Sequence, residues 1–132
     1  MILVDSSVWI DYFNGIATIQ TDYLDKILGK ELIIVGDIIL LEVLQGFKSD
    51  RDYSIARQSL EEFPFRNILG KEIALKSAYN YRYLRKKGIT IKKTVDLIIA
   101  TFCIENNIEL LYSDRDFDPL VKHLHLMNVL YE

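Results

Sequence analysis

Four acidic residues border apolar runs at well-separated points of the sequence. Asp5 follows ILV, Asp96 precedes LIIATFCI, Asp114 follows LLYS, and Glu42 lies inside DIILLEVLQG. A carboxylate taken out of water needs a compensating partner, yet no Arg or Lys lies within four residues of Asp5 or Glu42. Carboxylates that gather must protonate, pair with cations or bind a metal ion, and oxygen ligands favour Mg²⁺ or Mn²⁺ over zinc. The pattern therefore predicts a divalent metal site.

Most of these acids also have a purely structural explanation. Asp96, Asp114 and Asp116 fit the preference for acids at helix starts, and Asp5 could simply end a strand. Glu42 has no such role, because it lies in mid-helix among six apolar residues. It is the acid that most strongly indicates a site.

Short apolar runs alternate with amphipathic segments along the chain, which predicts an α/β fold. We expect a single domain over residues 1–132, with a mostly parallel central sheet of four to five strands and helices on both faces. Parallel strands end at a common edge of such a sheet, so the four acids could converge there. The predicted strands are 2–5, 31–36, 65–69, 109–113 and 126–131, and the predicted helices are 8–13, 19–28, 37–46, 52–63, 71–87 and 94–106.

Three helix starts have predicted caps. Ser6 or Ser7 would cap the first helix, and Asp37 would cap the helix that contains DIILLEVLQG. Ser113 begins SDRD, which has the spacing of a capping box.

Composition narrows the class of protein. The chain has 132 residues, of which 50% are hydrophobic and 27% charged, and this length and composition are typical of one globular domain. LIIATFCI is far shorter than the roughly 20 residues of a bilayer span, and the first residues lack a signal peptide's basic region. We expect no membrane association and a cytoplasmic location. Cys103, the single cysteine, should be a buried apolar residue rather than a reactive thiol.

Positive charge is concentrated in one segment. The net charge is −3, but RYLRKKGITIKK at 82–93 has six basic residues and no acid. Ten basic and nineteen acidic residues lie elsewhere, so the rest of the chain carries −9. Such a run is usually a solvated face, but it would also attract a polyanion.

The motifs, taken in order, resemble the PIN-domain ribonucleases and, within them, the VapC-type toxins of VapBC toxin–antitoxin systems. The matching pieces are VDSSVWIDYF, LLEVLQG, TVDLIIA and YSDRDF, and the resemblance extends over residues 1 to about 129. It implies a single PIN domain in which Mg²⁺, or Mn²⁺ as a substitute, is held by catalytic acids. The residues that match are the four catalytic acids Asp5, Glu42, Asp96 and Asp114, with Asp116 as a less secure metal ligand and Ser6 as a polar member of the site.

The resemblance also implies an activity and partners. The activity would be that of a Mg²⁺-dependent endoribonuclease, the toxin of a type II system, which cleaves RNA through a metal-activated water to leave a 5′ phosphate and a 3′ hydroxyl. Family members typically form homodimers and are silenced by a VapB-type antitoxin. Beside such a site, the predicted substrate contacts are Ser6, Arg85, Lys92, Lys93 and Thr94.

Aromatic and histidine residues are weaker candidates. Tyr79 and Tyr83 could stack on RNA bases, but at helical spacing they are more typical of core or dimer contacts. Trp9 is expected in the core or at an interface. His123 and His125 lie on different faces of a helix and should be surface residues.

Two rival functions remain. A haloacid-dehalogenase-like phosphatase needs a second Asp two residues after its nucleophilic Asp, and Ser7 stands at that position. The other alternative is a non-catalytic module with a PIN-like fold that binds RNA or a protein partner. Loss of an acid would favour this module, and all four are present.

Overall fold

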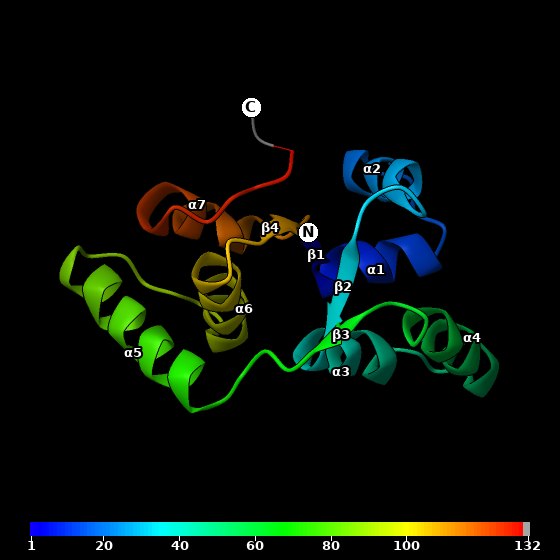
Figure 1. Cartoon of the computed structure of the whole chain (residues 1–132), viewed down its shortest axis with the longest axis horizontal. Coiled ribbons are helices and arrows are strands. Elements are labelled where there is room, and N and C mark those ends of the chain that lie inside the picture. The colour runs from blue at the N-terminus through cyan, green and yellow to red at the C-terminus, as the bar shows by residue number, and fades with distance from the viewer. Residues whose placement is uncertain (131–132) are drawn as a thin grey trace.

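A four-stranded, all-parallel sheet forms the centre of the computed structural model, which describes residues 1–130 (Figure 1). Its spatial order is β3-β2-β1-β4, so β1 pairs with both β2 and β4. The predicted α/β class and parallel sheet are confirmed. The strands are β1 (Ile2–Val4), β2 (Ile33–Gly36), β3 (Phe65–Arg66) and β4 (Glu109–Leu111).

The predicted fifth strand is wrong as far as residue 130, and Tyr131 lies outside the described residues. Only an isolated bridge joins Leu110 to Asn128 in this part of the chain. The Asn128 side chain accepts a hydrogen bond from the Leu130 backbone N–H at 3.0 Å. A local turn of this kind competes with ladder pairing, and the strand therefore does not extend.

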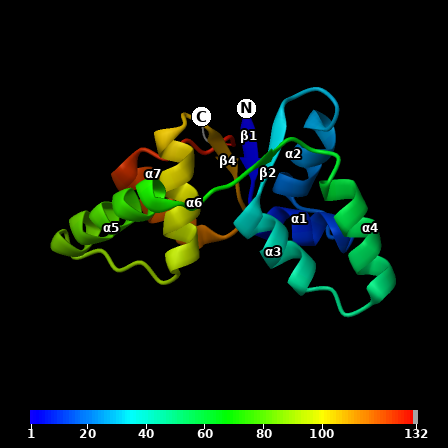
Figure 2. The same ribbon diagram turned by 60° about the horizontal axis from the view of Figure 1, so that its bottom comes forward.

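Helices cover both faces of the sheet, as predicted (Figure 2). In that view α1 to α4 lie on one side and α5, α6 and α7 on the other. No range was predicted for α7, although the helical setting assumed for His123 and the Pro119 in the first turn both indicate a helix here. The helices are α1 (Ser6–Phe13), α2 (Ile19–Ile27), α3 (Asp37–Gln45), α4 (Asp50–Leu60), α5 (Lys71–Lys86), α6 (Thr94–Glu105) and α7 (Asp118–Leu124), and a 3₁₀ turn, η1 (Arg115–Phe117), precedes α7.

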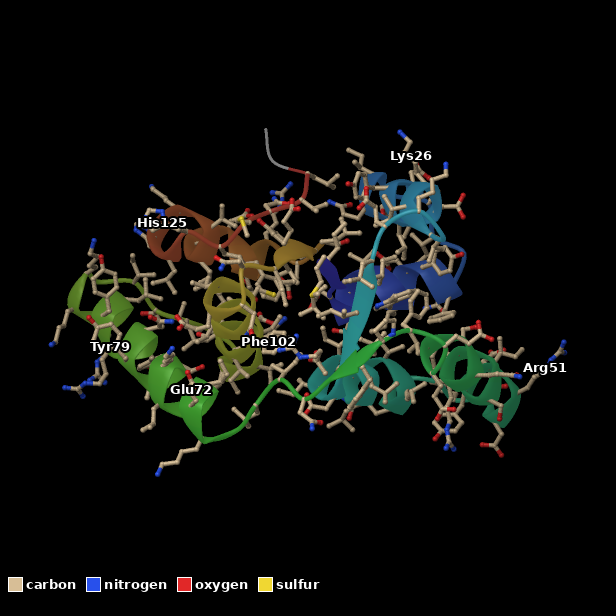
Figure 3. The ribbon with its side chains drawn as sticks, viewed as in Figure 1. Lys26, Arg51, Glu72, Tyr79, Phe102 and His125 are labelled. Carbon is tan, nitrogen blue, oxygen red and sulfur yellow. The ribbon has the colours of Figure 1, made fainter. Side chains whose placement is uncertain are left out.

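The core extends over both faces of the sheet, with buried side chains of α1, α2 and α3 on one side and of α6 on the other. All residues of β1 and β2 are buried, as expected for parallel strands covered on both faces. Seven of the twelve residues of α6 are buried, because this helix packs on β4, α5 and α7. Phe102 of α6 lies inside the molecule (Figure 3). Trp9 and Cys103 are also buried, which confirms the core alternative for Trp9 and the prediction for Cys103.

The start of α3 is held by a close contact that excludes any side chain at Gly36. A Cβ on this residue would lie 2.0 Å from Cδ1 of Ile68. Gly36, and not Asp37, occupies the N-cap position. The Asp37 carboxylate instead accepts a hydrogen bond from the Ile68 backbone N–H at 2.9 Å and ties the chain after β3 to the start of α3.

No helix within residues 1–130 has the length and apolarity needed to cross a membrane.

Candidate metal centre and active site

Asp5 lies at the carboxyl end of β1 and is held by the start of α1. Its Oδ2 accepts hydrogen bonds from the Ser7 backbone N–H at 3.1 Å and from Ser7 Oγ at 2.6 Å. The N-cap of α1 is therefore Asp5, which corrects the prediction of Ser6 or Ser7, because its carboxylate reaches the free N–H groups of the first turn. Burial raises the pKa of Asp5, against the opposing effect of the Ser7 hydrogen bonds.

Ser7 also joins two strand ends. Its Oγ accepts a hydrogen bond from the Ser113 backbone N–H at 3.2 Å, just beyond β4. The Asp5 backbone N–H donates to the Leu111 carbonyl at 2.9 Å. These contacts fix the end of β1 against the end of β4, and they bring Asp5 toward the segment that carries Asp114.

Glu42 extends from α3 to the same edge of the sheet. Its side chain is only partly buried, and its Oε1 accepts a hydrogen bond from Ser6 Oγ at 3.1 Å. Burial raises the pKa of Glu42, the Ser6 hydrogen bond opposes this, and the negative charge of Asp5 adds to it. Glu42, the acid surrounded by apolar residues in the sequence, therefore accepts a hydrogen bond from a hydroxyl group, and the charge of a second carboxylate raises its pKa.

Asp96, in the first turn of α6, is the acid most strongly perturbed. It is 6% exposed, and among residues 1–130 its Oδ2 has no hydrogen-bond partner. Burial raises its pKa to about 7, and the negative charges of Asp5, Asp114 and Glu42 add to this effect while Lys93 opposes it. A buried carboxylate oxygen without a partner is costly, and such an oxygen beside other acids is suited to bind a cation.

Asp114 and Asp116 complete the cluster from the segment after β4. Carboxylate oxygens of Asp96, Asp114 and Asp116 all lie within 4.8 Å of one another. Within residues 1–130 this tight group has only those three members, and Asp5 and Glu42 lie beside it. Asp114 Oδ1 accepts from the Asp116 backbone N–H at 2.9 Å, which makes Asp114 the N-cap of η1.

The predicted capping box at Ser113 is accordingly wrong. Ser113 Oγ is buried without a hydrogen-bond partner among the described residues, and the carboxylate of the next residue performs the capping. An ionised carboxylate is the stronger acceptor for a free N–H group.

Two lysines at the start of α6 reach this group. Lys93 Nζ lies 2.7 Å from Asp114 Oδ2 and 3.6 Å from Asp116 Oδ2, and Lys92 Nζ lies 3.9 Å from Asp116 Oδ1. Burial pushes the pKa of Asp114 upward, but the hydrogen bond and charge of Lys93 outweigh it and leave that pKa below its usual value. The hydrogen bond to Asp114 raises the pKa of Lys93.

These residues fit a hard divalent cation. The donor set is made of carboxylate oxygens, and one of them, Asp96 Oδ2, is buried and has no partner in the part of the chain that the structure describes. The mutual effects on pKa show that Asp5, Glu42, Asp96 and Asp114 share one electrostatic environment at the carboxyl edge of the sheet. The structure thus brings the predicted acids together, while their role as ligands stays a prediction.

A PIN-domain family model matches residues 2–122. The chain belongs to the PIN-domain family. Across 128 residues, which cover 96% of both chains, this PIN protein is 27% identical to a VapC ribonuclease of Mycobacterium bovis and equally to ribonuclease VapC11 of Mycobacterium tuberculosis.

Solved structures of low sequence identity share the fold of this PIN protein. VapBC2 from Rickettsia felis bound to a promoter DNA fragment matches with a TM-score of 0.76 and 18% identity over 97% of both chains. A toxin–antitoxin complex from Klebsiella pneumoniae matches with a TM-score of 0.69 and 22% identity over 89% of this chain and 90% of that one. VapC20 of M. tuberculosis, a Sarcin-Ricin loop cleaving toxin, matches with a TM-score of 0.67 and 12% identity over 90% and 94%.

The other residues predicted to contact substrate lie at two different sites. Ser6 lies in the acid cluster through its hydrogen bond to Glu42. Arg85 and Thr94 line a cavity of about 590 Å³ between α5 and α6, where the Arg85 guanidinium lies 5.7 Å from the centre of the Tyr81 ring. Among residues 1–130 Arg85 forms no ion pair with the acids, and a contact between Arg85 and substrate stays a prediction.

The side chain of Tyr79 is 70% exposed and points away from the molecule (Figure 3), and Tyr83 is also exposed. The core alternative for these two tyrosines is wrong, because they lie on the outer face of α5. His125 is exposed at the end of α7 and His123 is partly buried, so the surface prediction is confirmed for His125 only.

Sequence reasoning missed the structural role of Ser7. Its position two residues after Asp5 is typical of a hydroxyl that bonds back to a turn carboxylate, which was a usable signal. Its second bond, to the backbone of Ser113, joins residues 106 positions apart and had no local signal.

Proposed function

We propose that this PIN protein is a Mg²⁺-dependent endoribonuclease that acts as the toxin of a type II toxin–antitoxin system. The observation that carries the proposal is the cluster of carboxylates at the sheet edge, in which the buried Asp96 Oδ2 has no hydrogen-bond partner from residues 1–130. The 27% identity to VapC ribonucleases over nearly the whole chain supports the same activity.

Asp96, Asp114 and Asp116 would hold the cation most directly, with Asp5 and Glu42 beside them. A bound Mg²⁺ supplies an acidified water and stabilises negative charge at a phosphate. The chain's own residues do the rest: Ser6 and Ser7 orient Glu42 and Asp5 by hydrogen bonds, and the lysines at the start of α6 attract the RNA backbone. No nucleophilic side chain is required.

The test is hydrolysis of a mixed RNA pool by the purified chain in Mg²⁺ and in EDTA. Asp96→Asn should lower cleavage by at least the roughly 10- to 100-fold seen when partners of a metal site are removed. Glu62→Gln, an exposed acid outside the cluster, is the matched control and should cut normally. Cutting that persists in EDTA or in Asp96→Asn would exclude these residues as the nuclease centre. RNA binding without any cutting would favour the non-catalytic module.

We also propose two protein partners and a location. Toxin–antitoxin complexes among the structural neighbours support a VapB-type antitoxin, and exposed apolar side chains at Leu41, Leu75 and Tyr79 are suited to protein contacts such as those of a homodimer. Light scattering after gel filtration should give twice the mass of the single chain. An RNA substrate implies that the protein acts in the cytoplasm.

The whole chain, residues 1–132, is proposed to form one PIN domain. Limited proteolysis should then give one resistant core rather than two fragments.

A further inference from the structure

The ammonium group of Lys93 lies among the carboxylates of the acid cluster. Lys93 occupies the N-cap position of α6, and its side chain reaches the segment that follows β4. Its ammonium group donates a hydrogen bond to Asp114 Oδ2 at 2.7 Å and lies 3.6 Å from Asp116 Oδ2. Both carboxylates belong to the three-member group that lies within 4.8 Å. One ammonium group therefore contacts two of the three acids that could hold a metal ion.

We propose that Lys93 is the counter-ion of the metal-free site and that a divalent cation must displace its ammonium group in order to bind. This inference rests on the metal site of the proposed function and adds a residue that sets the affinity of that site. Asp114 Oδ1 already accepts a hydrogen bond from the Asp116 backbone N–H, so Oδ2, which Lys93 contacts, is the oxygen that remains for a dication, and the like charges of the two cations exclude close approach to the same oxygen. Binding is thus an exchange of cations at fixed carboxylates.

The surroundings of Lys93 suit such an exchange. Its side chain is 56% exposed, and an ion pair this open to water is weak and easily broken. The lysine stem is flexible, so the ammonium group moves into water without a change in α6. Asp96 Oδ2, buried and without a partner within residues 1–130, is the oxygen that the ammonium group leaves unsatisfied. A dication would satisfy that oxygen as well as those that Lys93 now contacts.

Displacement would also free Lys93 for a second contact. The released ammonium group would lie at the rim of the acid cluster, on a stem long enough to meet a phosphate of bound RNA. Metal binding and phosphate binding would then reinforce each other.

The test uses Mn²⁺ alone as the probe, with free Mn²⁺ measured by electron paramagnetic resonance during titration of the full chain. Lys93→Met removes the charge and keeps an apolar stem, and it should tighten Mn²⁺ binding about fivefold, the value of one exposed ion pair. Lys92→Met is the matched control, because Lys92 lies 3.9 Å from Asp116 and is 77% exposed. It should change the affinity less than Lys93→Met does, because the Lys92 ammonium group is more exposed, lies farther from the carboxylates and contacts only one of them. Lys93→Arg keeps the charge and should bind Mn²⁺ no more tightly than the unaltered chain.

Thermal unfolding gives a second readout with the opposite sign. In EDTA, Lys93→Met should unfold at a lower temperature than the unaltered chain, because its carboxylates lose their counter-ion. In saturating Mn²⁺ this difference should vanish. A lysine that only supports the fold would lower the unfolding temperature in both conditions.

The exchange is overturned if Lys93→Met binds Mn²⁺ with unchanged or lower affinity, or if Lys92→Met tightens binding equally. Those results, obtained with a chain that binds Mn²⁺ and cuts RNA, leave the proposed function intact. Absence of Mn²⁺ binding in the unaltered chain overturns both the exchange and the metal site. Tighter binding by Lys93→Met in a chain that cuts no RNA supports the exchange and refutes the nuclease.

Discussion

Replacement of Asp96 by Asn should have two effects. It should stabilise the metal-free protein against unfolding, and it should abolish metal binding. The ordinary pKa of this carboxyl group is 3.8, and burial beside other acids raises it to about 7 in the folded chain. Between these two values the folded state holds a proton that the unfolded state has lost. The free energy of unfolding therefore falls as pH rises from about 4 to about 7, and the loss is complete above that range.

The magnitude follows from the same two pKa values. Each pKa unit between the folded and unfolded states is worth about 1.4 kcal/mol, which sets an upper figure of about 4 kcal/mol for Asp96. The pKa of about 7 already includes the opposing charge of Lys93, and relaxation of the cluster with entry of water lowers the penalty further, so about 2 kcal/mol is the expected effect. Asn has nearly the same shape and no charge, so Asp96→Asn should recover this amount near pH 8.

Urea unfolding in EDTA, followed by circular dichroism at several pH values, measures the effect directly. Asp96→Asn should be about 2 kcal/mol more stable than the unaltered chain near pH 8 and should lose that advantage near pH 4. Mn²⁺ should stabilise the unaltered chain and leave the variant unchanged. Glu62→Gln serves as the control for loss of one exposed negative charge. If Asp96→Asn is less stable than the unaltered chain at pH 8, the carboxylate is not under electrostatic stress and the reasoning fails.

Further predictions concern the residues that hold the site in place. Gly36→Ala should lower the free energy of unfolding by about 1–3 kcal/mol, because its Cβ would meet a buried isoleucine at 2.0 Å, whereas Gly46→Ala, with no atom nearer than 3.6 Å, should change it little in the same urea experiment. Ser7→Ala removes the 2.6 Å hydrogen bond to Asp5 and should cost about 1–3 kcal/mol in unfolding free energy; an unchanged value would show that water replaces the hydroxyl. Cys103 is buried and burial raises the pKa of its thiol, so the folded chain should react with a thiol reagent only after unfolding, and fast labelling of the folded chain would contradict the burial.

The sheet was predictable from sequence because its strands are continuous apolar runs. ILV and IIVG have no alternation, and residues of this kind pack only where both faces of a sheet are covered. The same hydrophobic pattern led to the wrong prediction of a strand at the C-terminal end. LMNVL is apolar enough for a strand, but the Asn128 side chain bonds to the nearby backbone and stops the ladder after one bridge. Local polar competition of this kind is not visible in a hydrophobic pattern.

The acids of the candidate site were found because chain topology brings them together. Asp5 and Asp114 follow neighbouring parallel strands, and parallel strands end at one edge. Their exact partners could not be predicted, because each partner comes from a distant part of the sequence. Ser6 and Glu42 are 36 positions apart, and Lys93 and Asp114 are 21 apart. Lys93 was expected beside RNA phosphates, and its contact with the acids became visible only in three dimensions.

The choice of partners around the cluster has a physical reason. Hydroxyl groups hold Asp5 and Glu42, and each hydroxyl bonds to only one oxygen of its carboxylate. A buried arginine would do the opposite, because its planar fork binds both oxygens of a carboxylate and stays charged at any working pH. Stabilisation by such a residue would be permanent and would compete with any metal ion. An exposed lysine and two serines leave the acids incompletely compensated, and this residual repulsion would favour binding of a divalent cation at the proposed site.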